Sequence, residues 1–216
     1  MTTCVAPPDP EASLPPYFQR LTRKEAKAYL ARFIAELPAC RERLAGMLAS
    51  AGADPGLAQS FDPEAIDLIW QTAVAHWPMR WQDDYVHPPN TATPPIHKGT
   101  LTALGPPHLL PSWFIHDRIH ALRFHQDTLW VTDVLGRHLG EALIAWRPSL
   151  GWAPGPARPA SNIDRGCPVV ASPATWVNPL RAMQGLVHRQ ITGDVPPDAG
   201  FTPRAMLERW KEYNWD

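Results

Sequence analysis

The sequence predicts a single α+β domain that is mostly helical, and three observations support this fold class. Apolar residues recur at helical spacing in several segments that begin with a capping residue or a proline. Only "PSLGW" and "CPVVAS" have the features of short strands, and a proline-rich stretch at 87–111 separates two halves. We therefore expect a helical layer at 20–86, packed against a unit at 112–216 that holds a central helix, a small antiparallel sheet and closing helices, all within a domain of residues 17–216.

The N-terminal segments carry the start and stop signals of helices. Residues 1–16 contain five prolines and little that could pack, so we expect a loose arm there. Thr22 and Glu25 have the spacing of a capping box, in which each side chain satisfies the other's free backbone N–H. Pro38 separates this first helix from a second one that Gly52 can end.

The segment "FDPEAIDLIWQTAVAHW" predicts a third helix. Asp62 stands where a cap is expected, Pro63 at the first helical position, and Pro78 after the last turn. Its expected buried stripe is Ile66, Ile69, Trp70 and Val74. The stretch 87–111 has too many prolines for a regular element, so we expect a loop that crosses the surface between the two halves.

The strongest helical pattern is "DTLWVTDVLGRHLGEALIAW", with Asp127 as the expected cap. Its apolar positions are so numerous that we expect this helix at the centre of the core. Gly136 and Gly140 are four residues apart, which would let another backbone approach closely. The segments "NPLRAMQGLVHRQIT" and "TPRAMLERWKEYNW" predict the closing helices.

Composition excludes several classes of protein. The chain is 44% hydrophobic and 19% charged, with a net charge of −1 and no block of like charges, which argues against a nucleic-acid partner or an anionic membrane surface. No apolar run approaches the ~20 residues that span a bilayer. Cys4, Cys40 and Cys167 lie too far apart for a disulfide framework or a cysteine zinc site, and the first residues lack a signal-peptide pattern. We therefore expect a cytoplasmic protein.

The stretch "WFIHDRIHALRFHQ" is the first candidate site. His116 and His120 are four residues apart, so on a helix they would share a face and could hold a divalent metal, with Asp117 between them. The zincin motif needs a glutamate directly after the first histidine, and this sequence lacks it. In the alternative interpretation, which we favour, these histidines lie on a surface or make local hydrogen bonds.

A second pair of ionisable residues lies on the central helix. His138 and Glu141 are three residues apart and face the same way, close to the geometry of a metal-binding pair in reverse order. We favour a structural role, in which an arginine or backbone amides hold a buried Glu141 carboxylate.

Two other clusters give weaker signals. Asp83, Asp84 and His87 stand together near the start of the long loop, in a pattern typical of a solvated turn. "SNIDRGC" lacks the elbow that a serine nucleophile needs, and we expect Cys167 to be a small buried hydrophobe.

A family resemblance rests on "WVTDVLGRHLGEALIAWRPSLGW", "CPVV" and "NPLRAMQGL". Over residues 127–188 the chain resembles a group of uncharacterised actinobacterial proteins with an L-G-E helix followed by a tryptophan, and it is similar to immunity-type small α+β domains of bacteria. The resemblance implies a helix with a core glutamate at Glu141, and it implies no catalytic residue.

Two functional hypotheses follow. In the first, which we favour because no catalytic motif is complete, the chain is a non-catalytic binding protein with an immunity, sequestration or accessory role. Its proline-rich loops and aromatic side chains would bind a small molecule or a protein without a cofactor, the candidate residues being Trp77, Trp81, His87, Trp113 and Trp152. In the second, it is a metal-assisted hydrolase or lyase. His116, Asp117 and His120 would then act on the substrate or hold a divalent metal, with help from His87 or His138.

Overall fold

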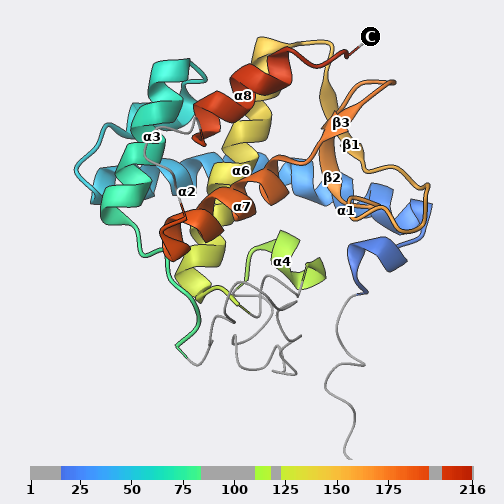
Figure 1. Ribbon diagram of the computed structural model, residues 1–216, viewed down its shortest axis with the longest axis horizontal. Helices are drawn as coiled ribbons and strands as arrows, with labels where there is room; N and C mark the ends of the chain where they lie inside the picture. The colour runs from blue at the N-terminus through green and yellow to red at the C-terminus, as the bar shows by residue number, and fades with distance from the viewer. Residues whose placement is uncertain (1–15, 84–109, 118–122, 195–200, 216) are drawn as a thin grey trace, which may run out of the picture.

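The helix α6 (Gln126–Trp146) is the element around which the others pack (Figure 1). The computed structural model describes residues 16–83, 110–117, 123–194 and 201–215. In α6 the ten consecutive residues from Val131 to Gly140 are all buried, so this helix is covered on every side. The expected position of this helix at the centre of the core is confirmed. Its cap is His125, whose ring accepts from the Asp127 backbone N–H, and not Asp127 itself, which lies in the first turn.

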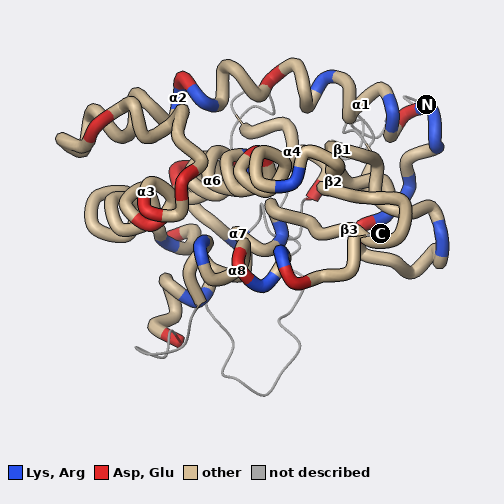
Figure 2. The backbone as a smooth tube through the Cα atoms, turned by 90° about the horizontal axis from the view of Figure 1, so that it is seen from above, with Lys and Arg blue, Asp and Glu red and all other residues tan. Residues whose placement is uncertain are grey.

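The N-terminal half consists of helices and short 3-10 turns. The 3-10 turn η2 (Phe18–Arg20) leads into α1 (Arg23–Ala35) and α2 (Leu37–Ser50), and η3 (Pro55–Gln59) leads into α3 (Pro63–His76). In Figure 2, α6 is seen nearly end-on, with α1 and α2 along one side and α7 and α8 along the other.

The sequence signals for the first three helices are largely confirmed. Thr22 and Glu25 form the predicted capping box, and Pro38 lies in the first turn of α2. Asp62 precedes α3, although its side chain makes no capping hydrogen bond. The predicted stripe on α3 was wrong at Val74, which is 39% exposed, because Ala73 is the residue of that turn that faces the core.

The C-terminal half contains the sheet and the remaining helices. After the short α4 (Ser112–His116) and α6 come the strands β1 (Gly151–Pro154), β2 (Pro168–Ala171) and β3 (Trp176–Val177), then α7 (Pro179–Thr192) and α8 (Pro203–Lys211). The strands pair antiparallel in the order β1-β2-β3. The predicted mostly helical α+β fold is therefore confirmed, with β3 as a two-residue strand that the sequence pattern did not indicate.

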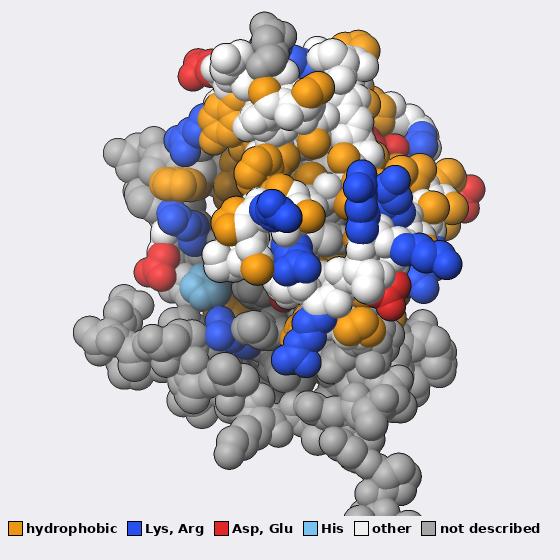
Figure 3. All heavy atoms as spheres, turned by 90° about the vertical axis from the view of Figure 1, so that its right-hand side faces the viewer, with side chains coloured by type: hydrophobic (Ala, Val, Ile, Leu, Met, Phe, Trp, Pro, Cys, Tyr) orange, Lys and Arg blue, Asp and Glu red, His pale blue; other side chains and the backbone are white. Residues whose placement is uncertain are grey.

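The sheet side of the molecule carries exposed apolar and basic groups. Ile163, between β1 and β2, is 62% exposed, and Trp176 of β3 is 38% exposed. Figure 3 shows this side, where the visible charged side chains are mostly Lys and Arg, separated by apolar and uncharged groups. The expectation that the chain binds no nucleic acid stays a prediction. None of the described helices combines the length and apolarity needed to cross a bilayer.

Two glycines let neighbouring elements reach the surface of α6. A Cβ placed on Gly136 would lie 2.9 Å from the Cα of Leu180 on α7, and one on Gly140 would collide with the ring of Trp152 on β1. The expectation of a close backbone approach is thus met at Gly136, whereas the neighbour at Gly140 is an aromatic ring.

We expect Gly136→Ala to lower the free energy of unfolding by about 1–3 kcal/mol, because a helix backbone cannot move aside as a side chain can. The matched control is Gly46→Ala on α2, where an added Cβ meets nothing within 4 Å. It should instead raise stability by about 0.5–1 kcal/mol through helix propensity. Urea unfolding of both variants measures the difference, and equal effects would contradict the close approach.

Candidate functional site

His116 is held by the N-terminal segment. Its ring Nδ1–H donates to the Pro16 carbonyl oxygen at 2.7 Å, and the ring packs against Phe18 and Tyr29 with centroids 5.0 and 4.8 Å away. The side chain is buried. His116 therefore lies in the core and is bonded to a residue 100 positions earlier in the chain, whereas the favoured interpretation placed it on a surface or in a local hydrogen bond.

Asp117 faces a different element. Its Oδ2 accepts from Gln184 Nε2 at 3.1 Å and lies 3.7 Å from the guanidinium of Arg181, both on α7. Asp117 itself has φ −107° and ψ 68°, which ends α4 at His116. The prediction that His116 and His120 share one helical face stays untested, because His120, like His87, lies outside the described residues.

The described part of the chain holds no group of three or more His, Cys, Asp or Glu side chains arranged to bind a metal ion. The metal-binding hypothesis for His116 and His120 stays a prediction.

The predicted tryptophan anchors are placed in or against the core. Trp113 is fully buried and Trp77 is 9% exposed. Trp152 is half-buried against Phe33, with ring centroids 5.0 Å apart, and against Gly140. Trp81, also half-buried, stacks on Phe124 at 5.2 Å. Since Trp113 and Trp77 have almost no exposed surface, a ligand could touch them only after a rearrangement.

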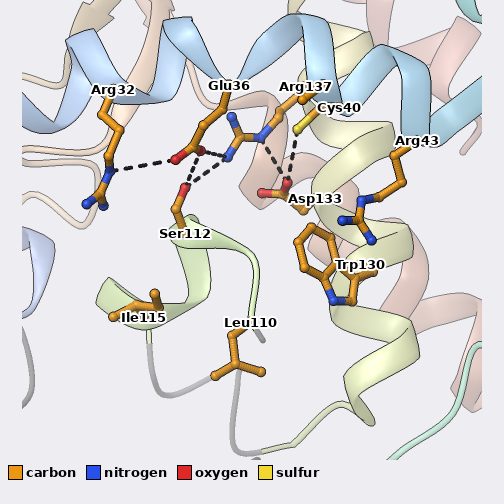
Figure 4. A pocket seen from close by; sticks show the side chains of 11 residues that line it. Arg32, Glu36, Cys40, Arg43, Leu110, Ser112, Ile115, Trp130, Asp133 and Arg137 are labelled. Carbon is orange, nitrogen blue, oxygen red and sulfur yellow. Dashed lines mark hydrogen bonds and ion pairs between the residues drawn. The ribbon is translucent and has the colours of Figure 1, made fainter. Parts of the chain in front are cut away.

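A cavity of about 330 Å³ opens between α2, α4 and α6 (Figure 4). Residues from α1 and α2 form one wall of the cavity. Leu110 and residues of α4 form the opposite wall, and α6 forms the floor. The lining residues are Arg32, Glu36, Ala39, Cys40, Arg43, Leu110, Ser112, Ile115, Trp130, Asp133 and Arg137.

Arg137 organises the floor of this cavity. The residue is 1% exposed, and its guanidinium donates to Asp133 Oδ2 at 2.9 Å, to Glu36 Oε2 at 3.0 Å and to the Phe33 carbonyl at 3.1 Å. The same group lies over the Phe33 ring, 4.0 Å from its centroid. A buried guanidinium is stable only when its donors are used, and these contacts join α6 to the junction of α1 and α2.

Ser112, the first residue of α4, joins this network from the opposite wall. Its hydroxyl donates to Glu36 Oε2 at 2.6 Å and accepts from Arg137 at 3.1 Å. The Tyr29 hydroxyl lies 3.3 Å from the Ser112 Oγ. These contacts fix where α4 begins, and with it one wall of the cavity (Figure 4).

Asp133 is the least satisfied group of the network. Its side chain is fully buried, yet only Oδ2 has hydrogen-bond partners, and Oδ1 has none among the described residues. Burial raises the pKa of this carboxyl, and the adjacent Arg137 opposes that shift. Figure 4 shows the second carboxylate oxygen on the side of Ser112, and this atom has almost no accessible surface.

Two further groups define what the cavity can do chemically. The Cys40 thiol lies 3.9 Å from Asp133 Oδ2, and burial raises its pKa to about 11, so the thiol is protonated near neutral pH and is a poor nucleophile. At the rim, the exposed Arg43 lies over the Trp130 ring, 3.7 Å from its centroid, and has no acidic partner among the described residues.

This cavity is not among the candidate sites that the sequence predicted. Asp133 and Arg137 are four apart in a helix that is otherwise strongly apolar, and this pair was the available signal that charge is buried there. Glu36 and Ser112 gave no such signal, because their link to Arg137 spans 101 and 25 residues of sequence.

The pair on the central helix, His138 and Glu141, has the arginine that the structural interpretation required. Arg41 Nη2 lies 3.3 Å from Glu141 Oε1, and both side chains are at least two-thirds buried. Burial, with the nearby charge of Arg41, lowers the pKa of His138 to about 4. The imidazole is therefore neutral in the folded chain at pH 7.

The "SNIDRGC" segment is also held structurally. Asp164 Oδ1 accepts from Asn178 at 2.8 Å and from Arg181 Nε at 3.0 Å, which ties the β1–β2 connection to α7. Cys167 is fully buried and burial raises its pKa to about 12, so this thiol is the small buried hydrophobe that the sequence predicted.

We expect His116→Ala to lower the free energy of unfolding by about 2–3 kcal/mol, because the substitution leaves a void and an unpaired carbonyl at Pro16. His76→Ala is the control, since His76 is exposed in the last turn of α3, and its effect should stay within about 0.5 kcal/mol. Chemical denaturation measures both. A silent His116→Ala would contradict its place in the core.

His138 should make the fold sensitive to acid. The unfolded chain protonates this histidine near pH 6.5, whereas the folded chain does so only near pH 4, so protons favour unfolding across this window. Between pH 7 and 4 the wild type should lose up to about 3 kcal/mol more than His138→Gln does. Urea unfolding at several pH values gives this difference, and parallel curves for the two proteins would show that His138 is not held neutral.

Comparison with protein families, with curated proteins and with solved structures found no match to this chain. The resemblance over residues 127–188 therefore remains an expectation, and the geometry of the site alone indicates what the chain could bind.

Proposed function

We propose that the chain is a non-catalytic binding protein for a small molecule, and that its binding site is the cavity between α2, α4 and α6. The observation that carries this proposal is the fully buried Asp133 carboxyl, which lines the cavity and whose Oδ1 has no partner among the described residues. Since this atom has almost no accessible surface, a ligand donor would reach it after a shift of the side chains around it.

A buried acceptor without a partner costs about 1–3 kcal/mol, and a donor from a bound molecule would offset that cost. The volume of about 330 Å³ lies at the lower end of the range of about 300–1,000 Å³ for small-molecule sites. The lining also has the usual composition of such sites, with apolar walls from Leu110, Ile115 and Trp130 around a few fixed polar groups.

The polar groups of the cavity favour binding over catalysis. The Cys40 thiol is protonated at neutral pH, and the Ser112 hydroxyl already donates to Glu36, which also accepts from Arg137. None of the described lining residues is a histidine, so the cavity lacks the usual general base near neutral pH. A metal-assisted hydrolase or lyase at His116, Asp117 and His120 stays the alternative, but the described contacts direct His116 and Asp117 toward different elements.

A non-catalytic binding protein is the class of function that the sequence predicted, but the binding surface is a different one. Trp130 takes the place of the tryptophans named from the sequence, and Leu110 is the contribution of the proline-rich segment. We favour a small molecule over a protein partner in an immunity, sequestration or accessory role, because the unpaired acceptor lies at the bottom of a concave site.

Filling the cavity should abolish binding. Ala39 is an exposed residue of α2 that lines the cavity, so Ala39→Trp should block it without touching the network of Arg137. Ala49→Trp, at an exposed position of the same helix, is the matched control. Ligand-observed NMR with a library of polar fragments should find binders to the wild type and to Ala49→Trp that Ala39→Trp loses.

Asp133→Asn should weaken the same fragments about tenfold or more, since it replaces a charged acceptor with an amide. Its melting temperature and far-UV spectrum show whether the variant is folded. If no fragment distinguishes Ala39→Trp from Ala49→Trp, the cavity is not a binding site and the proposal is wrong.

A further inference from the structure

We infer that the ligand of this cavity is a small zwitterion of the amino-acid type, with an amine that donates to Asp133 and a carboxylate that pairs with Arg43. This inference rests on the proposed function and adds the chemical class of the ligand to it.

The floor of the cavity favours a cationic donor. The guanidinium of Arg137 bonds to Oδ2 of the fully buried Asp133 and leaves Oδ1 without a donor. Glu36 shares that guanidinium, but its side chain is 32% exposed and is also approached by Arg32 at 3.6 Å, so it adds no buried charge. A protonated amine at Asp133 Oδ1 would supply the missing hydrogen bond, and a charged donor makes such a bond stronger.

The rim favours an anion. Arg43 is exposed and has no carboxylate partner among the described residues, while its guanidinium lies 3.7 Å from the centre of the Trp130 ring. The ring restricts where this charge can be, and the cation–π contact leaves N–H donors free. Guanidinium donors match a carboxylate in two parallel hydrogen bonds, so this position suits the acidic end of a ligand.

Asp133, whose Oδ1 lacks a partner, and Arg43, which has no carboxylate partner among the described residues, lie on the same side of the cavity. Figure 4 shows Asp133, Trp130 and Arg43 next to one another, with Ser112, Ile115 and Leu110 across the open space. A ligand with its amine at the floor and its carboxylate at the rim would place the rest of its body against the apolar wall. The volume of about 330 Å³ suits a molecule of about this size.

A simple ion can pair with either Asp133 or Arg43, but not with both. An inorganic anion would use Arg43 and leave Asp133 Oδ1 unpaired, whereas a simple amine would leave Arg43 unpaired. The inference is therefore that neither end alone gives the affinity of the whole.

The test uses the full chain and the twenty standard α-amino acids, screened one at a time by thermal shift and then by isothermal titration calorimetry. The tightest binder is compared with its decarboxylated amine and its deaminated acid. We expect each truncated analogue to bind at least tenfold more weakly than the amino acid.

Two substitutions assign the two ends. Arg43→Gln should weaken the amino acid about tenfold or more while it leaves the amine analogue unchanged, and Asp133→Asn should weaken the amine analogue while it leaves the acid analogue unchanged. Arg23→Gln, at an exposed arginine outside the cavity lining, is the control and should change none of them.

The inference is wrong if no amino acid binds, or if an analogue with one charged end binds as tightly as the amino acid. In either case, fragments that Ala39→Trp excludes and Ala49→Trp retains would show that the cavity still binds another class of molecule. If such fragments are absent as well, the proposed function fails together with the ligand class.

Discussion

A pair of opposite charges inside a helix that is covered on all sides is the constraint on which the rest of this structure depends. Asp133 and Arg137 lie one turn apart on α6 and are each about 1% exposed. Removing one partner of such a pair costs about 3–5 kcal/mol, because the other charge is left buried and unpaired. Arg137 has more donors than Asp133 can use, so the junction of α1 and α2 and the start of α4 must lie where Phe33, Glu36 and Ser112 accept them.

This constraint also explains why there is a cavity at the same place. The polar groups that satisfy Arg137 come from three separate elements, and their positions are set by hydrogen-bond geometry and not by close packing. On the apolar side of α6, close packing sets the positions of the neighbouring elements. There Gly136 allows α7 to reach the helix surface, and Gly140 admits the ring of Trp152. One helix thus has a tightly packed side and a side where a hollow remains.

Local chemistry predicted most of the helices, because caps and prolines act over a few residues. Thr22 with Glu25, Pro38 and Pro63 placed the starts of three helices, and the apolar pattern of 127–146 placed the core. Helix α4 shows the limit of periodicity, because the backbone of Asp117 leaves the helical region one residue after His116, and the spacing of the sequence gives no sign of this. The burial of Val74 was wrong because the buried stripe of Ile66 and Ile69 continues at Ala73, seven and four residues further on, and not at Val74.

The site could not be predicted in the same way, because its members meet only in the fold. Glu36, Ser112 and Arg137 come from three elements, and nothing in the spacing of each indicates the other two. Tryptophan content alone did not indicate which of these residues lines the cavity: Trp113 and Trp77 are buried in the core, while Trp130 lines the cavity.

The most direct measurement is a crystal structure of the chain with a bound molecule. The molecule to use is the tightest binder among those that the wild type and Ala49→Trp bind and Ala39→Trp does not. We expect this molecule to lie between α2, α4 and α6, with a donor atom within about 3.2 Å of Asp133 Oδ1. A structure in which Oδ1 is bonded to a protein group, or in which the molecule binds elsewhere and the cavity is filled by side chains, would show that the cavity is not the binding site.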